Sequence, residues 1–123
     1  MMSSLWRTVL TVTRSQYLDP DTLLPTEIQI VDGIPVAPSQ TTFQMRCSCQ
    51  EPTGDQMAMF PEGRKSTRNR VTYGNVVCQV ADEKTGAIAD TTVHTGYGLV
   101  AIWSRPWGEG NLAHVETGWA SNS

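Results

Sequence analysis

The 123-residue sequence contains no apolar run that approaches the roughly eighteen residues needed for a membrane-spanning helix. It also lacks an excess of positive charge, because nine Lys and Arg residues stand against twelve Asp and Glu residues and leave a net charge of −3. The first absence argues against a transmembrane protein, and the second argues against a chain-wide nucleic-acid binder. The N-terminus has no apolar segment followed by a cleavage site, so we expect no signal peptide.

Cysteine is scarce as well, since Cys47, Cys49 and Cys78 are the only three. An odd number without a secretory signal is typical of reduced thiols in a cytosolic product. Cys47 and Cys49 would share one face of a strand, about 7 Å apart, which is too far for an unstrained disulfide. A zinc site that adds His94 or His114 is disfavoured, because structural sites usually place two to four residues between paired ligands. We therefore expect no metal and no cofactor.

Catalytic signatures are missing too. His94 and His114 fall in predicted strands, and neither lies beside a nucleophile on a sharp turn. Gly96 and Gly98 lack the third glycine and the following helix of a phosphate-binding loop. We therefore predict that the protein is not an enzyme.

What the sequence does contain is a series of short alternating segments, rich in β-branched residues and separated by Gly, Pro and Asp. About seven short strands are predicted, within residues 6–13, 27–31, 41–49, 71–73 with 76–80, 91–94, 99–103 and 112–119. On the strand over 41–49, the face of Phe43, Met45, Cys47 and Cys49 is expected to be the core face. Turns are expected at Asp32-Gly33, at residues 96–98 and over 105–111. One short helix is expected within residues 51–60. The chain is thus predicted to be a single, mainly β domain over 1–123, closed or partly open as a small barrel or sandwich. Because only 39% of residues are hydrophobic, we expect a thin core and surface buried by other subunits.

The N-terminal part differs from the rest. Residues 6–36 are expected to form a hairpin that projects from a barrel formed by residues 41–119. Its tip, residues 17–25, is polar and contains two prolines, while Pro35 and Pro38 disfavour inclusion in a central sheet. A long hairpin of this kind is well placed to reach a neighbouring subunit.

Positive charge is concentrated in one loop, where Arg64, Lys65, Arg68 and Arg70 supply four of the nine basic residues. A charge run usually means a solvated loop. We nevertheless expect these four residues to contact acidic residues of a neighbouring subunit or of the adjoining ring. Nucleic acid is disfavoured, because the run contains no aromatic residues and the chain is acidic.

Tryptophan is unusually frequent, with four residues against two Phe. Tryptophan is favoured at interfaces, where one end of the side chain is apolar and the other needs a partner. Trp6 and Trp119, near the two termini, are expected to face another subunit. Ordinary burial is expected for Trp103 and Trp107.

Several short motifs follow one another in a set order. They are Val12-Thr13-Arg14 with Tyr17, Gln50-Glu51-Pro52, Met59-Phe60-Pro61-Glu62-Gly63-Arg64-Lys65, the acidic segment 81–86, Pro106-Trp107 with Gly110, and His114-Val115-Glu116. This series resembles the head–tail joining proteins of tailed bacteriophages, also called head-closure, neck or collar proteins. The resemblance covers about residues 9–118 and departs from the family pattern at an apparent insertion over 32–40, at 96–100 and at Val115.

The resemblance implies a structural protein that forms a ring of six or twelve copies in the virion neck after assembly in the host cytoplasm. The ring would join a portal or adaptor protein on one side to the tail or the next neck protein on the other. Genomic DNA would pass through it without sequence-specific binding, and no membrane would be involved. The resemblance also marks Pro61, Glu62, Gly63, Pro106 and Trp107 as structural motif residues.

Two other interpretations stay open. One is a different structural protein of the tail or baseplate. The other is a monomeric small β-barrel that binds a ligand or single-stranded nucleic acid, which predicts basic and aromatic residues on one barrel face. Particle size separates a ring from a compact monomer.

Overall fold

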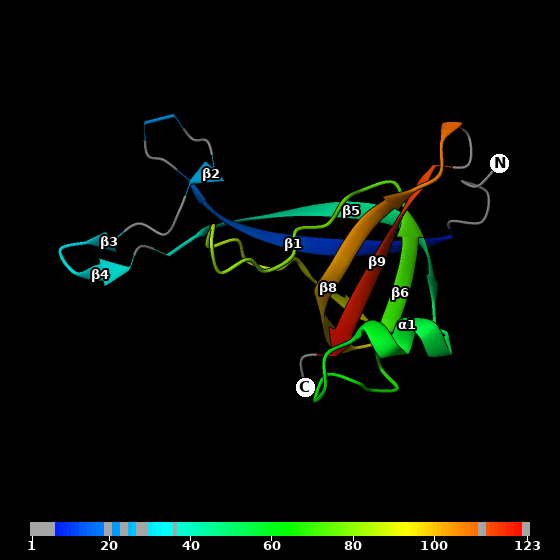
Figure 1. The fold of residues 1–123 in the computed structure, drawn as a ribbon. Coiled ribbons are helices and arrows are strands. Elements are labelled where there is room, and N and C mark those ends of the chain that lie inside the picture. The colour runs from blue at the N-terminus through cyan, green and yellow to red at the C-terminus, as the bar shows by residue number, and fades with distance from the viewer. Residues whose placement is uncertain are drawn as a thin grey trace.

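The structure is a computed structural model that describes residues 7–18, 21–22, 25–26, 30–35, 37–110 and 113–121. Its elements in chain order are β1 (Thr8–Leu18), β2 (Pro25–Thr26), β3 (Ile30–Val31), β4 (Ile34–Pro35), β5 (Ser39–Gln50), α1 (Gly54–Met59), β6 (Arg70–Gly74), β7 (Thr91–His94), β8 (Tyr97–Trp107) and β9 (His114–Ser121). The main sheet runs β2-β1-β5-β6-β9-β8-β7, and its ends meet because β1 also pairs with β7. Six strands thus form a closed antiparallel barrel (Figure 1). The predicted mainly β fold, with a small barrel and one short helix, is confirmed.

The first strand belongs to the barrel, which corrects the predicted boundary of the projecting hairpin. A hairpin within residues 6–36 would pair the two halves of that segment. β1 does pair with β2 at Tyr17 and Leu18, but its longer stretch, from Thr8 to Gln16, pairs with β5 from Cys47 to Ser39. The reason is burial, because Leu10 of β1 points into the core. Trp6 lies outside the described residues.

The ribbon of β1 and β5 runs past the barrel and leads to β2 and to the hairpin of β3 and β4, which lie away from the barrel body (Figure 1). We call residues 15–40 the arm. The predicted turn at Asp32-Gly33 is confirmed, and it joins β3 to β4. Both residues have a positive φ, 53° and 79°, as a type I′ hairpin turn requires.

The core lies inside the barrel and follows the alternation of the strands. It consists of Leu10, Val12, Met45, Cys47, Cys78, Leu99, Ala101 and Trp119. On β5 the predicted inward face is confirmed, because Met45 and Cys47 are buried and Phe43 packs against them.

Residues 76–80, predicted as a strand, are not one, since β6 ends at Gly74 and an irregular segment follows. Cys78 points into the core, and its backbone N–H donates to Ser104 Oγ at 2.9 Å. A side chain therefore replaces the neighbouring strand as the hydrogen-bond partner. The following hairpin turns at Thr95-Gly96, one residue before the predicted glycine pair, and Pro106-Trp107 ends β8 instead of forming a turn.

The short helix is confirmed as α1. Thr53 caps it, because Gln56 N donates to Thr53 Oγ1 at 3.3 Å and Thr53 N donates to Gln56 Oε1 at 3.0 Å. Phe60 follows the helix and is buried against Trp103, with ring centroids 4.8 Å apart. The helix segment thereby covers the outer side of the barrel. In the described residues, no helix is long and apolar enough to cross a membrane.

Candidate interaction surfaces

The basic loop over residues 61–70 has a defined shape. It opens with a turn in which Arg64 N donates to Pro61 O at 3.0 Å and Gly63 takes a φ of +85°, which favours glycine. Asn69, which sequence reasoning did not single out, is fully buried and ties the loop down. Its Nδ2 donates to Arg64 O at 2.7 Å, and its Oδ1 accepts from Ser121 N at 2.9 Å. The loop is therefore fixed to the end of β9.

The four basic side chains of this loop are not equivalent. Arg70 folds back on its own loop, donating to Thr67 O and Asn69 O at 2.8 Å each. Its guanidinium therefore stabilises the loop. The Nε of Arg64 is buried and has no hydrogen-bond partner among the described residues.

Lys65 and Arg68 are the more outward pair. Lys65 Nζ lies 2.9 Å from Glu62 Oε1, and this hydrogen bond holds the pKa of Glu62 below its usual value. Arg68 lies over the ring of Tyr97, 4.0 Å from its centroid, which joins the basic loop to the turn between β7 and β8. Both side chains belong to exposed residues.

The tryptophans are distributed differently from the prediction. Trp119 is 0% exposed and its Nε1 donates to Thr72 Oγ1 at 2.9 Å, so the prediction that it faces another subunit is wrong. It points into the barrel, with Thr72, because of its position on β9. Trp107 is 46% exposed, so the expected burial is also wrong for this residue. Trp103 is half-buried and lies over Gly118, where any Cβ would collide with its ring.

The exposed Trp107 is part of a small ordered surface on the outer side of β8. The Arg105 guanidinium lies 4.8 Å from the Trp107 ring centroid, and its Nη2 is 3.7 Å from Met59 Sδ at the end of α1. We call Met59, Arg105 and Trp107 the Trp107 platform. Trp103, Arg105 and Trp107 are spaced two apart, so strand alternation in the sequence was the signal that could have found it.

Glu116 fixes Arg105 of this platform, together with the neighbouring Trp103, through hydrogen bonds. Its Oε2 accepts from Trp103 Nε1 at 2.8 Å and from Arg105 Nε at 3.1 Å, and its side chain is almost fully buried. Gln56 of α1 adds a hydrogen bond to the Tyr73 hydroxyl at 2.6 Å, and a longer one to Glu116 at 3.5 Å. The platform is therefore fixed by residues from α1, β6, β8 and β9.

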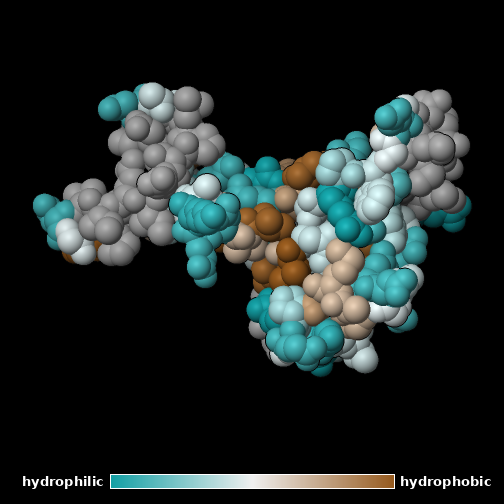
Figure 2. Space-filling model, in the orientation of Figure 1, coloured by the Kyte–Doolittle hydropathy of each residue, from teal (hydrophilic) through white to brown (hydrophobic). Residues whose placement is uncertain are grey.

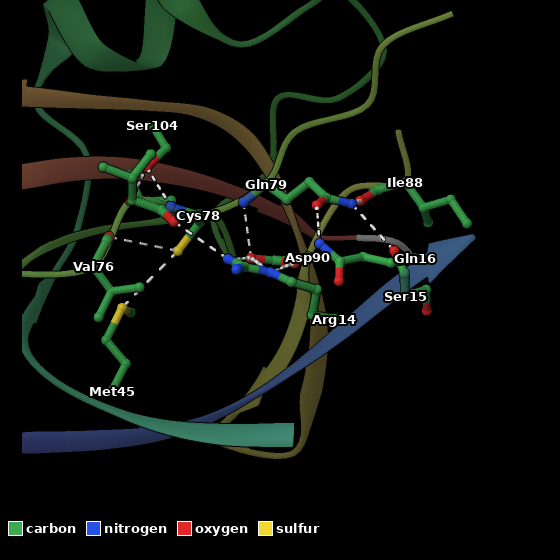
Figure 3. Close-up of polar contacts among 12 residues, drawn as sticks. Arg14, Ser15, Gln16, Met45, Val76, Cys78, Gln79, Ile88, Asp90 and Ser104 are labelled. Atoms are coloured by element: carbon green, nitrogen blue, oxygen red, sulfur yellow. Dashed lines mark hydrogen bonds and ion pairs between the residues drawn. The ribbon is translucent and has the colours of Figure 1, made fainter. Parts of the chain in front are cut away.

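A second polar cluster lies where the arm leaves the barrel (Figure 3). Asp90 is fully buried and accepts from Arg14 Nη2 at 2.7 Å, from Arg14 Nε at 3.0 Å and from Gln79 N at 2.8 Å. The hydrogen bond to Asp90 is the main cause that raises the pKa of Arg14. Gln79 in turn donates to Ser15 O at 3.1 Å and to Ile88 O at 2.8 Å. Because these bonds join β1 to the irregular segment, the cluster fixes the base of the arm.

Hydrophobic surface gathers between the arm and the barrel body, while hydrophilic residues cover much of the rest of this face (Figure 2). The irregular segment after β6 runs through this part of the view (Figure 1). Val77, in that segment, is exposed, and its carbonyl accepts from Arg14 Nη2 at 3.2 Å.

The three cysteines are free thiols. Burial raises the pKa of Cys47 to about 12 and that of Cys78 to about 11, and it also raises the pKa of Cys49. Thiols held protonated in this way are poor nucleophiles and poor ligands. In the part of the chain that the structure describes, no group of three or more His, Cys, Asp or Glu residues could hold a metal ion.

Comparisons with known proteins add no relative, since no family model, no curated protein and no solved structure matches the chain.

Proposed function

We propose that this protein is a ring-forming structural subunit of a tailed-phage neck, which joins the DNA-filled head to the tail. The sequence motifs set out above suggest the family. The observation that carries the proposal is the separation of two kinds of surface. The arm extends from one side of the barrel, while the basic loop and the end of β8 lie on other sides (Figure 1).

Surfaces that differ between the two ends of a molecule make head-to-tail contacts, and such contacts close into rings when the rotation per subunit allows it. A two-fold dimer would instead use one self-complementary patch. A projecting arm on a closed barrel is therefore suited to a ring in which each copy reaches the next.

Charge supports the same arrangement. Residues 15–45 contain four acidic residues and no Lys or Arg, whereas residues 64–70 contain four basic ones. Asp21 of the arm is an exposed residue. Acidic residues of one subunit would offset the basic loop of a neighbour or of the adjoining ring and fix the register of assembly. Each exposed pair contributes only about 0.2–1 kcal/mol, so specificity and assembly rate would change more than stability.

The ring would contact a portal or adaptor on one side and the tail or next neck protein on the other, with DNA passing through. A net charge of −3 suits that passage, since many phosphate contacts would hold the DNA and slow its release. The proposed role needs no catalysis and no cofactor.

The test uses the basic loop. Because Arg70 stabilises the loop itself, we would change only Lys65→Gln and Arg68→Gln together, with Lys84→Gln as an exposed control in another loop. We expect a folded double variant that assembles more slowly, with weaker salt dependence, and a control that assembles like the wild type. Tight, salt-sensitive binding of duplex DNA by the wild type, lost in the double variant, would show instead that the loop contacts phosphates.

A further inference from the structure

The Trp107 platform has the composition and order of an interface centre. Tryptophan and arginine are the residues most enriched among those that dominate binding energy, and methionine is enriched at interfaces. Here Trp107 and Met59 are 46% and 38% exposed, and Arg105 lies between them. Glu116 holds Arg105 in place, so a partner that binds the platform immobilises little that was free before.

The tip of the arm presents a single, highly exposed apolar side chain. Ile34 is 69% exposed, a larger fraction than any other large apolar side chain in the described residues. It directly follows the Asp32-Gly33 turn, and the exposed Asp32 stands two positions before it. The tight turn thus presents an apolar side chain and a carboxylate close together on a short hairpin.

The two surfaces match in chemistry and lie apart in one molecule. An isoleucine side chain can pack on an indole ring and a thioether, and a carboxylate beside Arg105 would face a guanidinium. The arm tip and the end of β8 lie on opposite sides of the barrel (Figure 1), so the arm tip meets the platform of another copy instead of its own.

We infer that the arm tip of one copy, formed by Asp32 and Ile34, docks on the Trp107 platform of the neighbouring copy. This inference rests on the proposed ring and names the contact that builds it. Apolar packing of Ile34 on Trp107 and Met59 supplies most of the affinity, because the charge of Arg105 is already shared with Glu116. The contact of the Asp32 carboxylate with Arg105 fixes the orientation of the arm tip on the platform.

The first test measures association by sedimentation velocity over a range of concentrations. We expect Trp107→Ala and Ile34→Ser each to weaken assembly by about tenfold or more, as the loss of a central interface residue does. The double variant should be little weaker than either single variant, because both changes remove the same contact. Val93→Ser is the matched control, since Val93 is 62% exposed on the barrel strand β7. It should assemble like the wild type.

The second test joins the two surfaces covalently. A chain that carries both Ile34→Cys and Trp107→Cys should form intermolecular disulfides on mild oxidation, and a denaturing gel should show a ladder up to the whole ring. The two single variants and a chain with Ile34→Cys and Val93→Cys should give no ladder. Native Cys47 and Cys78 are buried and give little background, and the half-buried Cys49 is changed to Ser in all of these chains.

The outcomes separate the inference from the proposed function. If the wild type forms a ring that neither variant weakens, the docking contact is wrong while the ring stands. If Trp107→Ala weakens assembly but Ile34→Ser does not, and no ladder forms, the platform binds something other than the arm tip and the inference fails. If the wild type stays monomeric at every concentration, both the inference and the proposed ring fail.

Discussion

The barrel and the arm share two strands yet differ in what holds them together. In the barrel, Leu10 of β1 and Met45 of β5 point into a common core, where both are almost fully buried. In the arm, residues 39 and 40 of β5 are exposed, and so are the adjoining residues 41 and 42, so both faces of β5 meet solvent there. The barrel is stabilised by its own burial, whereas the described part of the arm has few apolar contacts of its own.

This difference teaches where stability and assembly reside. A two-stranded ribbon is only marginally stable alone, and here its base is fixed to the barrel by the Arg14–Asp90 pair. Changes in the barrel core should therefore alter the free energy of unfolding. Changes in the arm should alter association and leave unfolding nearly unchanged.

The largest expected effect comes from comparing a buried with an exposed tryptophan, both on barrel strands. Trp119→Ala should lower the free energy of unfolding by about 4 kcal/mol, because it leaves a cavity and removes the hydrogen bond to Thr72. Trp107→Ala should change it by less than about 1 kcal/mol, because that side chain is exposed. Urea denaturation of the two variants measures the contrast, and equal losses would contradict it.

Breaking the base of the arm should have the next largest effect. Arg14→Ala leaves the carboxylate of Asp90 buried without its cation, and we expect a loss of about 3 kcal/mol. The double change Arg14→Ala with Asp90→Asn should recover part of that loss, because no buried charge then stays unpaired and the amide oxygen can still accept from Gln79 N. Arg46→Ala, at an exposed position of β5, is the control. A double variant less stable than Arg14→Ala would show that the Arg14–Asp90 pair contributes more to stability than the neutralisation of a buried charge.

A smaller effect should appear at alkaline pH. Burial raises the pKa of Cys78 from an ordinary 9.0 to about 11, so the folded chain keeps this proton after the unfolded chain has lost it. The stabilisation is complete below pH 9 and is lost as the pH rises through 11. Thermal unfolding between pH 7 and 11 should therefore show a steeper alkaline decline for the wild type than for Cys78→Ala. Parallel declines would assign the loss to other groups.

The smallest effect on stability should follow shortening of the arm. Deleting residues 16–25 removes the hydrogen bond from Gln16 to Gln79, so the barrel should lose about 1 kcal/mol or less. The shortened chain should fold and fail to assemble, because its arm no longer carries Asp32 and Ile34 as far as the neighbouring copy. Normal assembly of this variant, measured by sedimentation, would mean that residues 16–25 are not needed for the contact.

Local signals in the sequence predicted much of this molecule. The Asp32-Gly33 turn, the short helix before Pro61 and the buried face of β5 all depend on residues close together in the chain. They follow from dihedral preferences and from a period of two, and each was predicted correctly.

The predictions that failed depend on contacts distant in the chain. Whether Trp119 or Trp107 is buried depends on the register between β8 and β9 and on where Phe60 covers the sheet. The irregular path of residues 76–80 depends on Asp90, whose carboxylate takes the N–H of Gln79. The periodicity of a single segment does not indicate which distant residues that segment will contact. The Trp107 platform and the polar cluster at the base of the arm therefore could not be predicted from the sequence.

The mass of the purified wild-type chain in solution tests the central claim most directly. Analytical ultracentrifugation should show one discrete species at six or twelve times the 13.5 kDa of a single chain, about 81 or about 162 kDa, and the chain without residues 16–25 should sediment as a monomer. A wild-type chain that stays a compact 13.5 kDa monomer at every concentration would contradict the account.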